Sequence, residues 1–202
     1  MSIPSSSIAG LLLAAGEARR FGMPKQLLVS KGQPLLRHMI LEWQEAGEWP
    51  LAVVLGARAA TIKPVIEDLP IHIVENEDWS SGMAGSIRVG LQALLHQFPD
   101  LKAVLIMVGD QAYLNEEILK DILSTYQESN AAIVACTYDN GGKGVPVLFT
   151  QALFSALLDL EGQEGARKLL SMHESLVKWV PFPRGHLDID QPDDWENYLK
   201  RP

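Results

Sequence analysis

The stretch Gly10-Leu-Leu-Leu-Ala-Ala-Gly-Glu-Ala-Arg-Arg-Phe-Gly-Met-Pro-Lys25 places an apolar run directly before a loop rich in glycine and positive charge. A short apolar run without polar alternation is typical of a β-strand that is covered on both faces. The run from Gly10 to Ala15 therefore predicts a buried strand. The loop that follows falls at the carboxyl end of this strand, the edge where open α/β sheets bind ligands.

The same pattern recurs along the chain. Further apolar runs lie at 51–55, 71–74, 103–108, 131–135, 145–149 and 176–180. Amphipathic stretches separate them and predict helices at 34–46, 59–68, 82–97, 115–129, 151–158 and 165–172, with a last helix from Pro192. This alternation predicts an α/β fold with a Rossmann-like, mostly parallel sheet flanked by helices. Because no long linker or internal repeat interrupts it, we expect a single domain over residues 1–202.

Composition narrows the choice of partners. The formal net charge is -8, which disfavours nucleic acid and anionic membranes, since both select for basic patches. The apolar run at the N-terminus is too short to span a bilayer. Cys136 is the single cysteine, so an internal disulfide is impossible, a reducing cytoplasm is the expected setting, and Cys136 is expected in the core.

The first candidate site is the loop after the first run. Gly16 and Gly22 bracket Arg19 and Arg20, and Lys25 follows. Glycine lets backbone N–H groups approach a ligand, and three cations stand out in an acidic chain, so the loop suits phosphate. It fits neither the Walker A nor the Gly-x-Gly-x-x-Gly spacing. Composition alone leaves a solvated basic loop as an equally good reading.

Acidic residues supply the second and third candidates. Asp110 directly follows the apolar run 103–108, where a carboxylate can bind magnesium; capping the next helix is the alternative, although Asn115 is better placed to cap it. Asp188 and Asp190 lie two residues apart and can face one site if the chain is extended. Asp193 and Asp194 suit the first turn of the last helix instead.

The fourth candidate is the stretch of small residues from Asn76 to Ser86, which also contains Gly82. Its N–H groups and hydroxyls are able to read the edge of a nucleobase. A helix entry rich in serine and glycine is an equally good reading of the same residues.

Taken in order, these segments resemble one family. The loop 13–25 is similar to the signature loop of nucleotidyltransferases with a GT-A-like Rossmannoid fold, and the closest likeness is to molybdenum cofactor cytidylyltransferases. The likeness continues through 76–86, Gly109-Asp-Gln111, Lys143-Gly-Val-Pro-Val147, Glu164-Gly-Ala-Arg167 and Asp188-Ile-Asp-Gln-Pro-Asp193. The resemblance implies a nucleotide-binding N-terminal part and an acceptor-binding C-terminal part.

The resemblance also implies roles for individual residues. Backbone contacts to the nucleotide would come from Leu13, Ala14, Ala15 and Gly16, and Asn76, Gly82 and Ser86 would also bind it. Arg20 and Lys25 would bind the phosphates, and Arg19 would also contact the nucleotide. Arg20, Lys25 and Asp110 would be the catalytic groups. Asp110 and Asp190 would hold Mg²⁺, with Asp188 supporting them. Asp193 and Asp194 would serve the helix and not the metal.

The implied reaction is transfer of CMP from CTP to the terminal phosphate of molybdopterin, with release of pyrophosphate. The Ala14-Ala15-Gly16 form of the loop favours CTP over GTP. Two positions depart from the family: Glu17 replaces a small hydroxyl residue, and Ala112 replaces a proline. A molybdenum hydroxylase apoenzyme is a further possible partner. The alternatives are a related enzyme that uses GTP or another phosphorylated acceptor, and a non-catalytic carrier of the cofactor.

Overall fold

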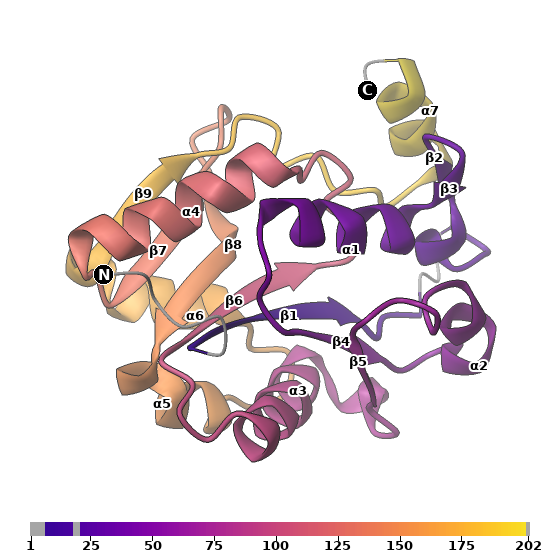
Figure 1. Ribbon diagram of the computed structural model, residues 1–202. Helices are drawn as coiled ribbons and strands as arrows, with labels where there is room; N and C mark the ends of the chain where they lie inside the picture. Colours follow the sequence, from indigo (N-terminus) through magenta and orange to yellow (C-terminus); the bar gives the residue numbers. More distant parts are fainter. Residues whose placement is uncertain (1–6, 18–20, 201–202) are drawn as a thin grey trace.

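The computed structural model describes residues 7–17 and 21–200, and a seven-stranded sheet in the order β5-β4-β1-β6-β8-β7-β9 forms its centre (Figure 1). The strands are β1 (Ile8–Ala14), β4 (Leu51–Leu55), β5 (His72–Glu75), β6 (Ala103–Val108), β7 (Ile133–Thr137), β8 (Lys143–Thr150) and β9 (Val177–Pro181). Each apolar run that predicts a strand forms one, within two residues at most boundaries. The predicted α/β fold is confirmed.

The sheet is mostly parallel, as predicted, with β8 as the exception. β1 pairs in parallel with β4 and β6, and β7 pairs in parallel with β9. β8 lies between β6 and β7 and runs antiparallel to both. Its direction could not be predicted, because an apolar run reads the same way in either orientation. As a result, the starting end of β8 lies at the edge of the sheet where the parallel strands finish.

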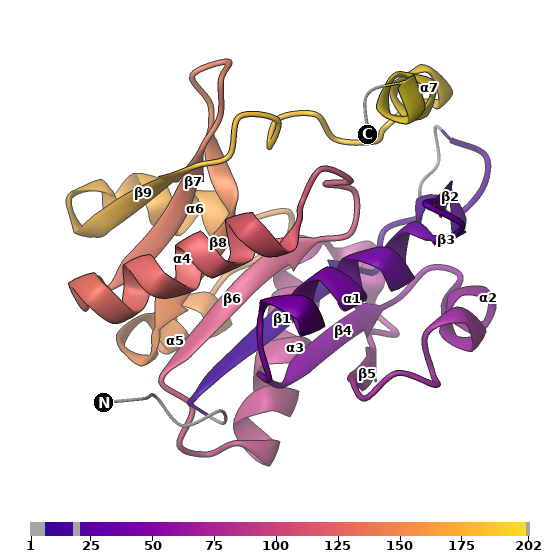
Figure 2. The same ribbon diagram turned by 45° about the horizontal axis from the view of Figure 1, so that its top comes forward.

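Helices cover both faces of the sheet (Figures 1 and 2). On one face lie α1 (Leu35–Ala46) and α4 (Glu116–Ser129); on the other lie α3 (Met83–Gln97), α5 (Phe154–Leu158) and α6 (Ala166–Met172). β1 accordingly buries Leu12 in the core beneath α1 and Leu11 in the core beneath α3. Both faces of the strand are buried, which explains why apolar and polar residues do not alternate along it.

Close packing of α3 on the sheet depends on a glycine. A Cβ placed on Gly90 would lie 2.3 Å from the Leu11 Cδ1 atom and 2.7 Å from the Val54 Cγ2 atom. Both neighbours are buried core side chains that cannot move aside without opening a void. The glycine thus lets α3 approach β1 and β4 closely, and the start of α3 is held over the end of β1.

Two local features differ from the sequence prediction. The helix predicted over 59–68 is a short α2 (Ala59–Ile62) followed by a 3₁₀ turn at Lys63–Val65, because Pro64 lacks the N–H that would continue the α-helical ladder. A small hairpin of β2 (Val29–Ser30) and β3 (Gln33–Pro34) was not predicted, since two-residue strands carry no readable period. The remaining 3₁₀ turns are Lys25–Leu27, Trp79–Ser81, Gln151–Leu153 and Glu174–Leu176.

The last helix, α7 (Pro192–Lys200), lies beside the β2–β3 hairpin in both views (Figures 1 and 2). A buried hydrogen bond of 2.7 Å joins the hydroxyls of Ser30 and Tyr198.

Cys136 is fully buried, and burial raises the pKa of its thiol to about 12, so it is a core residue, as predicted. Within the described ranges, no helix is both long and apolar enough to cross a membrane.

Candidate active site

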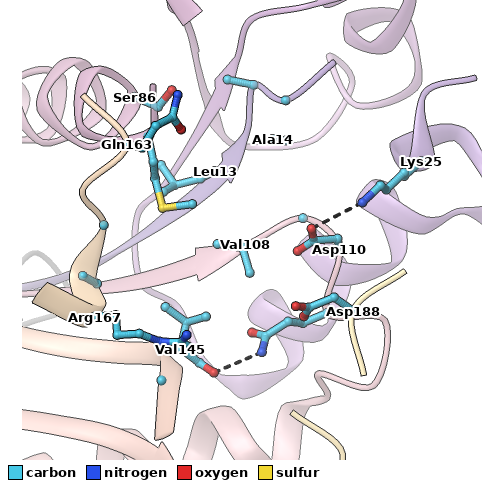
Figure 3. Close-up of a pocket in the computed structure, with 18 of the residues that line it drawn as sticks. Leu13, Ala14, Lys25, Ser86, Val108, Asp110, Val145, Gln163, Arg167 and Asp188 are labelled. Atoms are coloured by element: carbon cyan, nitrogen blue, oxygen red, sulfur yellow. Dashed lines mark hydrogen bonds and ion pairs between the residues drawn. The ribbon is translucent and has the colours of Figure 1, made fainter. Parts of the chain in front are cut away.

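A cavity of about 980 Å³ opens at the carboxyl edge of the sheet, above the ends of β1 and β6 (Figure 3). Its floor includes Leu13 and Ala14 from β1 and Val108 from β6. The reversed β8 adds Gly144 and Val145 from its starting end. The cavity is large enough for a nucleotide-sized ligand, and it lies at the edge that the sequence predicts.

The predicted nucleotide loop lies on the wall of this cavity. Leu13, Ala14, Ala15 and Gly16 all line it, as does the unusual Glu17. The structure also places Lys25 in the wall, at the start of a 3₁₀ turn. Arg19 and Arg20, which were predicted to bind phosphates, lie outside the described residues.

Lys25 lies between two of the predicted aspartates. Its Nζ is 2.5 Å from Asp190 Oδ1 and 3.6 Å from Asp110 Oδ2 (the Asp110 contact is drawn in Figure 3). The lysine side chain is only 13% exposed, whereas the Asp110 and Asp190 side chains are 33% and 41% exposed. A largely buried cation therefore faces two partly exposed carboxylates, of which Asp110 lines the cavity and Asp190 lies just behind the lining. The structure brings together the two residues that the resemblance implies as metal ligands.

Backbone contacts carry the C-terminal segment to this position. The Ile189 N–H donates to the Asp110 carbonyl oxygen at 3.0 Å. Asp194 Oδ2 accepts from the backbone N–H groups of Asp190 at 2.9 Å and Gln191 at 2.7 Å. Asp193 and Asp194 both lie in the first turn of α7, as predicted, but Asp194 also fixes the backbone of the residue that contacts Lys25.

The third aspartate of the segment, Asp188, also lines the cavity. Desolvation, followed by repulsion from Asp110 and Asp190, raises the pKa of Asp188 to about 7. Desolvation also raises the pKa of Asp110, although the Lys25 cation opposes that rise. Asp188 is an exposed residue at the rim, so water screens part of this repulsion. The carboxylates repel one another in the absence of added positive charge.

Oxygen ligands of this kind suit a small divalent cation that completes its shell with water and phosphate. Within 7–17 and 21–200, no group of three or more His, Cys, Asp or Glu residues is arranged to enclose a metal by itself. Asp110 and Asp190 thus fit a cation that also takes ligands from a bound substrate, and they do not form a structural metal cage.

The predicted residues of the Asn76–Ser86 stretch divide into two groups. Gly82 and Ser86 line the cavity. Asn76 is buried behind the wall, where its Nδ2 donates to Ser86 Oγ at 3.0 Å and its Oδ1 accepts from the Asp78 N–H at 3.1 Å. The structure therefore places Asn76 as a support for Ser86 rather than in the lining.

Gln111, the residue after Asp110, connects separate segments of the cavity wall through hydrogen bonds. Gln111 is 2% exposed, and its Nε2 donates to the carbonyls of Val145 at 3.1 Å and Gly185 at 2.6 Å. This side chain links the end of β6 to β8 and to the C-terminal segment. The departure at Ala112 also has a structural consequence: its N–H donates to the Asp110 carbonyl at 3.1 Å, a bond that proline cannot make.

Several lining residues were not singled out from the sequence. Tyr138, Gln163, Arg167 and His186 come from the C-terminal half of the chain. Arg167 lies in the first turn of α6 and reaches the cavity beside Val145 (Figure 3). The sequence predicts a strand at 145–149 and a helix at 165–172, but only the family likeness links these segments to the site. The likeness was therefore the available signal for a second, cationic part of the cavity.

Comparison with known proteins identifies the family. The MobA-like NTP transferase domain matches residues 10–177. The chain belongs to this family. The match covers the Gly-rich loop, Lys25 and Asp110, and the protein is a nucleotidyltransferase of the MobA-like family.

Individual relatives are similar over nearly the whole chain. The chain is 29% identical to nicotine blue oxidoreductase of Paenarthrobacter nicotinovorans over 179 residues, which cover 86% of each protein. The crystal structure of Rv0371c from Mycobacterium tuberculosis H37Rv superposes with a TM-score of 0.83 at 28% identity, covering 97% of this chain and 99% of that one. A manganese complex of Rv0371c gives a TM-score of 0.77 at 27% identity, with 97% and 100% coverage.

Proposed function

We propose that the protein transfers CMP from CTP to the terminal phosphate of molybdopterin and releases pyrophosphate. The observation that carries this proposal is the constellation of Lys25, Asp110 and Asp190 beside the Gly16 loop. The Ala14-Ala15-Gly16 form of the loop favours CTP. A phosphate acceptor is itself the nucleophile, so positioning and charge neutralisation are what the protein must provide.

Each part of the cavity has a task in this reaction. The backbone around Ala14 and Gly16 approaches the nucleotide, and the Lys25 ammonium binds phosphate oxygens and stabilises charge as pyrophosphate departs. Asp110 and Asp190 would hold Mg²⁺, which supplies further neutralisation of phosphate charge when bound. Manganese bound to Rv0371c supports the use of a divalent cation.

The acceptor is assigned to the part of the cavity around Arg167 and Val145. Arg167 supplies a guanidinium there, across from Asp188 (Figure 3), and guanidinium groups bind phosphate oxygens in pairs. A single domain thus holds both substrates, with the nucleotide on the N-terminal part. We place this reaction in the cytoplasm and take a molybdenum hydroxylase apoenzyme as the recipient of the product.

One relative favours a second candidate. The likeness to nicotine blue oxidoreductase extends over 86% of both chains, so a redox activity in the same cavity is the competing proposal. The Lys25, Asp110 and Asp190 group suits the binding of a divalent cation and phosphate, which favours nucleotidyl transfer over this candidate.

The deciding experiment measures pyrophosphate release from CTP, GTP, ATP and UTP with Mg²⁺, with and without molybdopterin. The proposal predicts release from CTP that requires the acceptor. Release only with GTP, or only with another phosphorylated acceptor, would reassign the substrates within the family. No release with any pair, together with conversion of nicotine blue in the presence of an added reductant, would favour the redox candidate.

A further inference from the structure

The cavity is divided by polarity. Lys25, Asp110 and Asp188 form a charged end, while Leu13, Ser86 and Gln163 form an uncharged end (Figure 3). A nucleoside triphosphate has the same division, with a charged triphosphate and an uncharged base. A base placed beside Asp110 would force desolvation of charge without compensation. The uncharged end is therefore the complementary place for the base.

The loop that carries Gln163 is seated directly on the start of α3. The Ala84 N–H donates to the Gly162 carbonyl at 3.2 Å. A Cβ on Gly82 would lie 2.1 Å from the same oxygen, and Gly82 also has a φ of 123°. Gly82 is thus required both by its backbone conformation and by this contact. The contact fixes how far the loop stands from Ser86.

Glu164 stabilises the loop that carries Gln163 through a hydrogen bond and an ion pair. Its Oε2 accepts from the Glu161 N–H at 3.0 Å, and its Oε1 lies 2.5 Å from Lys168 Nζ. Gln163 projects from this braced turn toward the cavity and toward Ser86 (Figure 3). Among the described residues, the Gln163 amide has no hydrogen-bond partner, so both its donor and its acceptor are available to a ligand.

Ser86 complements this amide. Because Asn76 Nδ2 donates to Ser86 Oγ at 3.0 Å, one of the two acceptor positions of the serine oxygen is occupied, and its hydroxyl hydrogen is left to donate elsewhere. The uncharged end therefore offers one oriented donor from Ser86 and a donor–acceptor pair from Gln163. This set matches the polar edge of a nucleobase better than it matches a phosphate.

We propose that Gln163 contacts the Watson–Crick edge of the nucleobase and disfavours guanine. This inference rests on the proposed function, because it requires a nucleoside triphosphate in the cavity. Cytosine presents an amino donor next to a ring acceptor, which pairs with an amide. Guanine presents its O6 acceptor followed by two donors, N1–H and N2–H. With O6 facing the Ser86 hydroxyl, the two donors face Gln163, where an amide cannot satisfy both but a carboxylate can. Gln163 thereby adds to the preference for CTP over GTP.

The test compares wild type with Gln163→Ala and Gln163→Glu, using Gln127→Glu on α4 as the charge-matched control. The dissociation constants of CTP and GTP are measured by calorimetry with Mg²⁺, and thermal unfolding checks that each variant is folded. Gln163→Ala is expected to weaken CTP binding about tenfold, the scale of one or two lost neutral hydrogen bonds. Gln163→Glu is expected to move the CTP-to-GTP ratio toward GTP by a further factor of about ten. Gln127→Glu should change neither constant.

Three results would overturn the inference in different ways. If wild type prefers CTP and both Gln163 variants keep its affinities, Gln163 has no role in base selection, while the proposed function stands. If wild type binds no nucleoside triphosphate, the proposed function itself fails and the inference fails with it. A wild type that prefers GTP would contradict both the CTP assignment and the role of the amide.

Discussion

Lys25 Nζ and Asp190 Oδ1 lie 2.5 Å apart, although 165 positions separate the two residues in the chain. The contact joins the end of the N-terminal loop to the segment before the last helix. Asp110 Oδ2, at 3.6 Å from the same ammonium, adds the end of β6. Three distant parts of the chain therefore meet at one cation.

Replacing Lys25 by alanine should lower kcat for CMP transfer by about 10²–10³-fold, the scale for removal of one preorganised charge donor. The fold should persist, because the residue packs at the cavity wall and not in the core. Lys31→Ala is the matched control, since the Lys31 side chain is 57% exposed and lies outside the cavity. Steady-state kinetics decides the matter: a Lys25→Ala enzyme with near wild-type kcat would show that the lysine has only a surface role.

Asp190→Asn should raise the Mg²⁺ concentration needed for half-maximal activity and lower the turnover, because a neutral amide is a poorer ligand for a hard divalent cation than a carboxylate. Asp193→Asn, in the first turn of α7, changes the same charge without touching the site. Magnesium titrations of both variants provide the comparison. Equal shifts in the two would mean that net charge, and not ligation, is responsible.

Asp194 should act through the position of Asp190. Asp194→Asn keeps an oxygen that can accept from the Asp190 and Gln191 N–H groups, so its magnesium requirement should stay close to that of wild type. Asp194→Ala removes both bonds and should raise the magnesium requirement in the same direction as Asp190→Asn. An Asp194→Ala protein that is merely less stable, with unchanged magnesium dependence, would limit Asp194 to capping the helix.

The metal-free protein should lose stability as the pH rises, in part through Asp188. Its pKa rises from 3.8 to about 7 on folding, so the folded state binds the proton more tightly than the unfolded state. The associated stability is complete below pH 4 and is lost as the pH rises through 7. Asp188→Asn should therefore raise the midpoint of thermal unfolding in EDTA more at pH 8 than at pH 4.5. A gain of equal size at both pH values would argue against repulsion among the carboxylates.

Much of the fold was readable from local pattern. The apolar runs that form β1, β4 and β6 are buried on both faces, and such strands need unbroken hydrophobic sequence. The pattern could not give the direction of β8, because an apolar run does not show whether the strand pairs in parallel or antiparallel with its neighbours. It also could not give the small β2–β3 hairpin, which is too short to show a period.

By itself, the sequence determined the α/β architecture, the edge of the sheet where the site lies, and the residue types that carry charge there. Only the tertiary structure decided which of these residues meet. Lys25 and Asp190 are brought together by the Ile189–Asp110 backbone bond and by Asp194, and Asn76 is turned inward to hold Ser86. Gln163 reaches the cavity because Gly82 and Gly162 allow two loops to touch. Local pattern records whether a side chain is apolar or polar, whereas these pairings depend on long-range packing that has no signature in neighbouring residues.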